Sequence, residues 1–180
     1  MSNNRRSNQY NTKKLTVCAM LAALGVILLY LGSLVEVLDI SMAVIASLLC
    51  VVAVIEYGGG APWMIYGVTA ILSLVLLPNK TPAALYAIFF GFYPVLKEKF
   101  EKCNRALAWV LKEITFNAAM VVAGLVAVFV LLGPDNALVN PLVIGVAVVL
   151  CEIVFVLYDI AMTRLITFYL VTLRSRFKFK

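Results

Sequence analysis

Histidine is absent from the chain. Its absence removes histidine-based acid/base catalysis, histidine metal ligands and haem ligation through histidine. The four cysteines, Cys18, Cys50, Cys103 and Cys151, stand far apart and form no CxxC pair. Because disulfide frameworks and zinc sites need paired spacing, we expect reduced thiols that pack on helix faces. The sequence therefore predicts neither a metal site nor a bound cofactor.

Common enzyme signatures are missing as well. The chain contains no Walker A sequence, no GxSxG, no HExxH and no GxGxxG. The three glycines at positions 58–60 have no lysine after them, so they indicate a turn and not a phosphate loop. We therefore predict that the protein is not an enzyme.

Charged residues are scarce. They make up 13% of the chain, whereas hydrophobic residues make up 64% and the mean hydropathy is +1.03. These values lie outside the range of soluble domains. Long apolar runs recur with charges confined between them, which is typical of helices that cross a bilayer, and the alternating segments of a β-barrel are absent. The sequence predicts an all-α integral membrane protein.

Six apolar runs are predicted as membrane spans of one helix bundle. Gly and Pro separate several of them, in EYGGGAP, PNKTP and GPDNALVNP, because these residues stop or restart helices. The sixth run corresponds to roughly 50 Å of helix against a bilayer core of about 30 Å, so its end should project beyond the membrane. The predicted spans are residues 15–34, 40–55, 62–77, 82–96, 107–132 and 141–173.

The basic residues lie almost entirely on one predicted side of the membrane. Every Lys and Arg except Lys80 falls before the first span, around the loop between the fourth and fifth spans, or near the C-terminus. By the positive-inside rule both termini are cytoplasmic, so the net charge of +6 is a topology signal and implies no nucleic-acid partner. We predict a basic tail (1–14), a six-helix membrane domain (15–173) and a second basic tail (174–180) that attracts anionic membrane lipids.

Two polar layers are expected inside the bundle. Glu152 lies near the middle of the sixth span and matches the depth of Asn117 on the fifth, while Asp159 matches Lys112 nearer the cytoplasm. A carboxylate at mid-membrane is costly unless it is neutral, paired or in contact with water. The layers are either part of a ligand pocket or ion path, or contacts that hold the helices together.

The predicted outer loops supply further candidates for substrate binding. Asn79 and Lys80 follow the third span, Asn140 precedes the sixth, and Tyr86 lies one turn inside the fourth. Lys80, the one base predicted on that side, would pair with a carboxylate or phosphate on a ligand, and Tyr86 would stack on a ring. The alternatives are that Lys80 and its neighbours are ordinary polar loop residues, and that Tyr86 belongs to the interfacial aromatic belt.

The first span carries small residues within two turns: Cys18, Ala19, Ala22, Ala23 and Gly25. Small residues four apart, here Ala19 and Ala23, let a partner helix approach closely. With its short basic N-terminus, its opening AMLAALGVIL and its length, the chain resembles the S-component of energy-coupling-factor (ECF) vitamin transporters, the substrate-binding subunit of these importers.

This resemblance implies a partner and a ligand. Ala19, Ala22 and Ala23 would contact a transmembrane T-component that two ATPases drive. Asn79, Lys80, Asn117, Asn140 and Glu152 would line a pocket for a small water-soluble vitamin-like molecule, with Tyr86 beside it, in a bacterial plasma membrane. Two alternatives stay open: a membrane scaffold of the rod-shape-determining D type, and a small proton-linked carrier using Glu152, although such carriers usually show inverted repeats.

Overall fold

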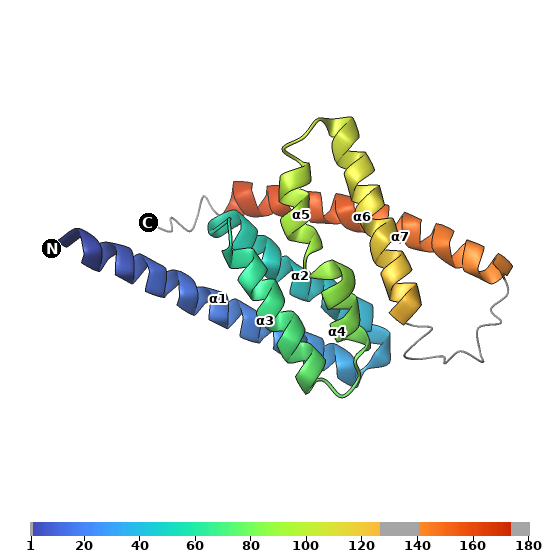
Figure 1. Cartoon of the computed structure of the whole chain (residues 1–180), viewed down its shortest axis with the longest axis horizontal. Helices are drawn as coiled ribbons and strands as arrows, with labels where there is room; N and C mark the ends of the chain where they lie inside the picture. Colours follow the sequence, from blue (N-terminus) through green and yellow to red (C-terminus); the bar gives the residue numbers. More distant parts are fainter. Residues whose placement is uncertain (1, 127–140, 174–180) are drawn as a thin grey trace. The chain divides into compact units, whose positions relative to one another are not determined.

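The computed structural model describes residues 2–126 and 141–173, and these residues form helices joined by short turns (Figure 1). None of them belongs to a β-strand. The predicted all-α fold is therefore confirmed for the described part of the chain. By contact the chain divides into two compact units, unit 1 (Met1–Ala123) and unit 2 (Gly124–Lys180).

Helices of membrane-crossing length occur in both units. Four of the described helices are long and apolar enough, and Ala61–Leu76 is a shorter apolar helix. These lengths and compositions are those of a helical membrane protein. The four segments are Thr12–Leu34, Asp39–Glu56, Arg105–Val126 and Gly145–Val171.

The first three helices of unit 1 follow the first three predicted spans. They are α1 (Ser2–Leu34), α2 (Asp39–Glu56) and α3 (Ala61–Leu76), with the 3-10 turn η1 (Glu36–Leu38) between the first two. The predicted N-terminal tail is continuous with α1, because no glycine or proline interrupts the chain before Gly25. Between α2 and α3, Gly58 and Gly59 adopt φ angles of 55° and 57°, a left-handed turn that suits glycine.

The fourth predicted span is not one continuous helix. The short helix α4 (Thr81–Leu85) runs into the π-helical segment η2 (Tyr86–Phe90), and α5 (Tyr93–Phe100) begins after a turn at Gly91 and Phe92. Pro94 lies in the first turn of α5, where a helix needs no N–H from it. The fourth predicted span, residues 82–96, is therefore interrupted at this turn, and a new helix begins with Pro94 in its first turn.

Helix α6 (Arg105–Val126) lies mostly in unit 1 and ends in unit 2. It covers most of the fifth predicted span, and residues 127–132 lie outside the described residues. In unit 2, α7 (Pro141–Phe168) continues into the π-helical segment η5 (Tyr169–Leu173). Together they follow the sixth predicted span from end to end, and the change of helix geometry falls in the part expected to project beyond the membrane. The predicted tail 174–180 lies outside the described residues.

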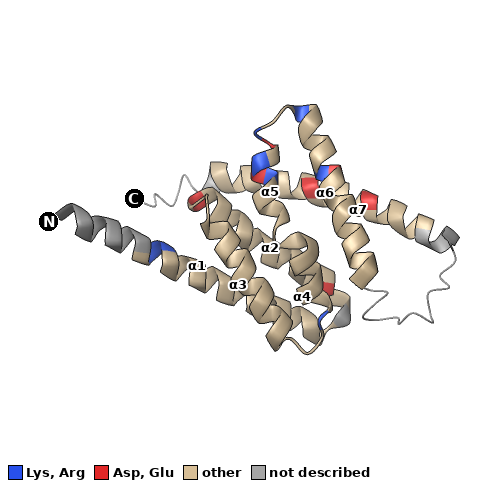
Figure 2. Ribbon diagram, in the orientation of Figure 1, with Lys and Arg blue, Asp and Glu red and all other residues tan. Residues whose placement is uncertain are grey.

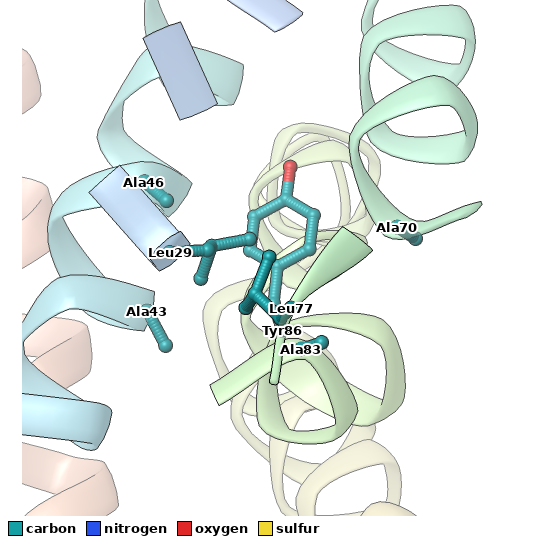
Figure 3. Close-up of a cluster of buried hydrophobic side chains, with 7 residues drawn as sticks. All are labelled: Leu29, Ala43, Ala46, Ala70, Leu77, Ala83 and Tyr86. Atoms are coloured by element: carbon teal, nitrogen blue, oxygen red, sulfur yellow. The ribbon is translucent and has the colours of Figure 1, made fainter. Parts of the chain in front are cut away.

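One core cluster of unit 1 is built mainly from small residues around a large ring. Figure 3 shows the ring of Tyr86 in the middle of the cluster, with Leu29 of α1 on one side and Ala70 of α3 on the other. Alanine at most of the remaining positions lets the helix backbones come close, as is common between membrane helices. The members are Leu29, Ala43, Ala46, Ala70, Leu77, Ala83 and Tyr86.

Gly91 lies directly beneath two tyrosine rings, so unit 1 should not tolerate a side chain there. A Cβ atom at this position would lie 2.5 Å from Cδ2 of Tyr66 and 2.7 Å from Cε1 of Tyr86. Gly91→Ala should lower the free energy of unfolding by about 1–3 kcal/mol, the usual cost of overpacking. Thermal or denaturant unfolding followed by circular dichroism in detergent measures this loss.

Gly67→Ala is the matched control, because a Cβ atom at Gly67 in α3 would meet nothing within 4 Å. It should leave stability unchanged or raise it by roughly 0.5–1 kcal/mol through higher helix propensity. Equal stability of the two variants would contradict the packing around Gly91.

Candidate functional site

The small residues of α1 lie on two different faces. Cys18, Ala22 and Gly25 are buried against α2 and α3, and the Thr69 hydroxyl donates a hydrogen bond to the Ala22 carbonyl at 3.4 Å. Ala19 and Ala23 are exposed on the other side of the helix. Of the three residues predicted to contact a partner, Ala22 packs inside unit 1, while Ala19 and Ala23 of the AxxxA pair are exposed.

Helical periodicity explains this division. Positions 18, 22, 25 and 29 repeat at three- and four-residue intervals, so they share one face, and Ala19 and Ala23 are turned away from it. The outward face also carries large exposed apolar side chains, as expected for contact with lipid or another helix. They include Leu15, Met20, Ile27, Tyr30 and Leu31.

At one end of unit 1, Asn79 links the starts of two helices. Its side-chain nitrogen donates to Asp39 Oδ2 at 3.3 Å, and its Oδ1 accepts from the Thr81 backbone N–H at 3.0 Å. Asp39 is buried at the start of α2, where a carboxylate is favoured by the helix dipole. Sequence reasoning missed Asp39 as a site residue, although an acidic residue directly before an apolar run signals such a helix start.

The side chain of Lys80, next to Asn79, caps the C-terminal end of α3. Its ammonium donates to the Leu77 carbonyl at 2.6 Å and to the Val75 carbonyl at 3.4 Å, so it lies against the C-terminal end of α3. A cation is favoured there because those carbonyls have no partner within the helix. The side chain remains exposed, so this end of unit 1 places an accessible ammonium beside an amide and a buried carboxylate.

The other predicted binding residues lie in other segments of the chain. Tyr86 is 1% exposed and belongs to the core cluster, so its ring does not lie on an open surface. Asn117 is exposed on α6 and donates to the Glu113 carbonyl at 3.0 Å. Glu152, on α7 of unit 2, is half-buried, and Asn140 lies outside the described residues.

Two lysines of unit 1 are buried and share one carboxylate oxygen. Lys97 of α5 and Lys112 of α6 lie 3.2 Å and 3.3 Å from Glu101 Oε1, and Glu101 itself is 42% exposed. The contact joins α6 to the end of α5. In the sequence, the i,i+4 spacing of Lys97 and Glu101 indicates that these two side chains can pair on one helix. Pairing of Asp159 with Lys112, and of Glu152 with Asn117, stays a prediction.

Among the residues that the structure describes, no three His, Cys, Asp or Glu side chains come together in a group that could hold a metal ion. Searches against protein-family models, curated proteins and solved structures find no match for this chain. Its chemistry therefore has to be argued from its own residues.

Glu101→Gln should destabilise unit 1, because two buried ammonium groups then lose the negative charge they share. We expect a loss of about 1–2 kcal/mol in the free energy of unfolding, between the values typical of exposed and buried ion pairs. The comparison is Glu98→Gln, which affects only the pair with Lys102 at 2.7 Å, both side chains being exposed. That control should cost about 0.5 kcal/mol or less. Similar losses for both variants in denaturant unfolding would argue against the shared contact.

Proposed function

We propose that the protein is the membrane-embedded, substrate-binding subunit of an ECF-type importer for a small water-soluble micronutrient. The observation that carries the proposal is the outward face of α1. Ala19 and Ala23 are left exposed while the neighbouring small residues are used inside unit 1, so a partner helix has a surface for close approach. The T-component would occupy this surface, and its ATPases would supply the energy.

The proposed topology has six crossings of a bacterial plasma membrane and both termini in the cytoplasm. Figure 2 shows charged residues at the two ends of α2 and uncharged ribbon through its middle and along α3. The end with Lys99 and Arg105 would face the cytoplasm under the positive-inside rule. The end with Asp39, Asn79 and Lys80 would then face outward. In this arrangement α4, η2 and α5 together make the fourth crossing.

Substrate would be captured at the outward end. Lys80 offers an exposed ammonium for a carboxylate or phosphate, and Asn79 offers amide hydrogen bonds beside it. Asn117, Asn140 and Glu152 stay predicted binding residues from the sequence. A ligand would have to displace the Lys80 ammonium from the α3 carbonyls. This exchange favours ligands with a full negative charge, since charge-assisted hydrogen bonds are stronger than neutral ones.

Copurification tests the partner contact. The protein is purified gently from its native membrane, and copurifying subunits are quantified by mass spectrometry. Ala19→Trp and Ala23→Trp should reduce recovery of a T-component and its ATPases on the order of tenfold or more, because a large ring blocks close approach. Ala118→Trp, at an exposed alanine of α6, is the matched control and should leave recovery unchanged.

Full recovery with tryptophan at both positions of α1 would rule out the outward face as the contact. Copurification of cell-wall or division proteins in place of a T-component would favour the scaffold alternative.

Ligand retention is measured in the same preparation as small molecules released on denaturation. Lys80→Gln should lower the amount of bound anionic ligand by about tenfold, the effect of losing one charge-assisted contact of about 1.5 kcal/mol. Leu76→Ala, at an exposed apolar position near Lys80, should leave it unchanged. If the wild-type protein releases no ligand and Glu152→Gln leaves its function unchanged, the scaffold alternative is favoured.

A further inference from the structure

Lysine side chains lie over aromatic rings at three places in unit 1. The ammonium of Lys14 is 5.8 Å from the centre of the Tyr57 ring, that of Lys99 is 5.8 Å from Trp63, and that of Lys112 is 5.5 Å from Trp109. Each distance is within the range of a cation–π contact. The pairs join α1 to the end of α2, and α5 to the start of α3, while the third lies within α6.

These pairs lie at one end of unit 1, opposite Asp39 and Asn79. A second core cluster packs Cys18 and Ala22 of α1 against Ala53 and Ala61, which flank the turn between α2 and α3. The Lys97–Glu101–Lys112 contact brings the end of α5 to the first part of α6. The helix ends that carry the lysine–aromatic pairs are thus held together by the core.

The surface at this end is both amphipathic and basic. Trp63 and Trp109 are each 39% exposed, and the nearby side chains of Lys99, Lys102 and Arg105 are exposed. Tryptophan prefers the boundary between hydrocarbon and headgroups, and lysine beside it reaches the level of the lipid phosphates. The described basic residues here outnumber the acidic ones. The bases are Lys13, Lys14, Lys97, Lys99, Lys102, Arg105 and Lys112, and the acids are Glu56, Glu98, Glu101 and Glu113.

We propose that this end of unit 1 is a binding surface for anionic phospholipid headgroups. The tryptophan and tyrosine rings anchor the helix ends at the acyl boundary, and Lys14, Lys99 and Arg105 contact the phosphates. Charge complementarity selects the occupant, because a zwitterionic headgroup offers no net charge to these bases. The residues that form the site all belong to unit 1. The proposal holds whether the protein is a transporter subunit or a scaffold.

The test uses the protein's own fluorescence. The chain contains two tryptophans, Trp63 and Trp109, and both lie at this surface, so their emission reports on lipids bound there. The full-length protein is reconstituted into phosphatidylcholine vesicles. Part of the lipid is then replaced by phosphatidylglycerol brominated in its acyl chains, or by equally brominated phosphatidylcholine. The ratio of the two quenching curves gives the relative association constant of the anionic lipid.

Brominated phosphatidylglycerol should quench more strongly than brominated phosphatidylcholine at equal mole fraction. Lys99→Gln should lower the preference for the anionic lipid by about fivefold, the factor expected for one lysine at an anionic surface. High salt should lower the same preference in the wild-type protein. Lys80→Gln, at the opposite end, is the matched control and should keep the preference.

Equal quenching by the two lipids in the wild-type protein would overturn the proposal. So would a preference that survives Lys99→Gln but disappears when Arg174, Arg176, Lys178 and Lys180 are replaced by Gln, since the tail would then be the binding element. If Lys99→Gln does not fold, the salt titration of the wild-type protein still tests the proposal, because a preference that is insensitive to salt would contradict it.

Discussion

The close approach of α1 to α2 and α3 is the contact on which the rest of unit 1 depends. A Cβ atom on Gly32 would lie 2.9 Å from Met42 Cβ, and one on Gly25 would lie 3.1 Å from Thr69 Cγ2. Helices in a bilayer gain little from burying apolar surface, so van der Waals contact between closely spaced backbones and occasional polar contacts must hold them together. One face of α1 is thereby committed to the fold, and Ala19 and Ala23 on another face are exposed.

The interrupted helix from Thr81 to Phe100 shows how unit 1 compensates for irregular backbone. The π-helical turn and the break at Gly91 change the usual hydrogen-bond pattern, which is costly in an apolar environment. The Tyr66 hydroxyl donates to the Ala87 carbonyl at 2.8 Å, and the Phe89 ring packs 5.4 Å from that of Phe116 on α6. Aromatic side chains therefore supply both a polar partner and the packing that connects this segment to its neighbours.

The two ends of unit 1 use their charges differently. At one end Lys97 and Lys112 converge on a shared carboxylate, while further bases lie over aromatic rings and reach outward. At the other end a single lysine caps a helix, and Asn79 connects the starts of α2 and α4. The first arrangement suits a permanent contact with lipid headgroups. The second leaves the side chain of a cation exposed.

The sequence by itself determined the class of the protein and the positions of most helices, because long apolar runs and their Gly and Pro boundaries are local properties of the chain. It also singled out Asn79, Lys80 and the small residues of α1. Tertiary structure alone decided which small residues face inward, that Tyr86 fills a core, and that Asp39 meets Asn79 across 40 positions of sequence. The packing of Tyr66, a residue of another helix, against Gly91 is likewise a tertiary contact. Such contacts depend on how helix faces are rotated against each other, and hydrophobicity does not specify that rotation when nearly every face is apolar.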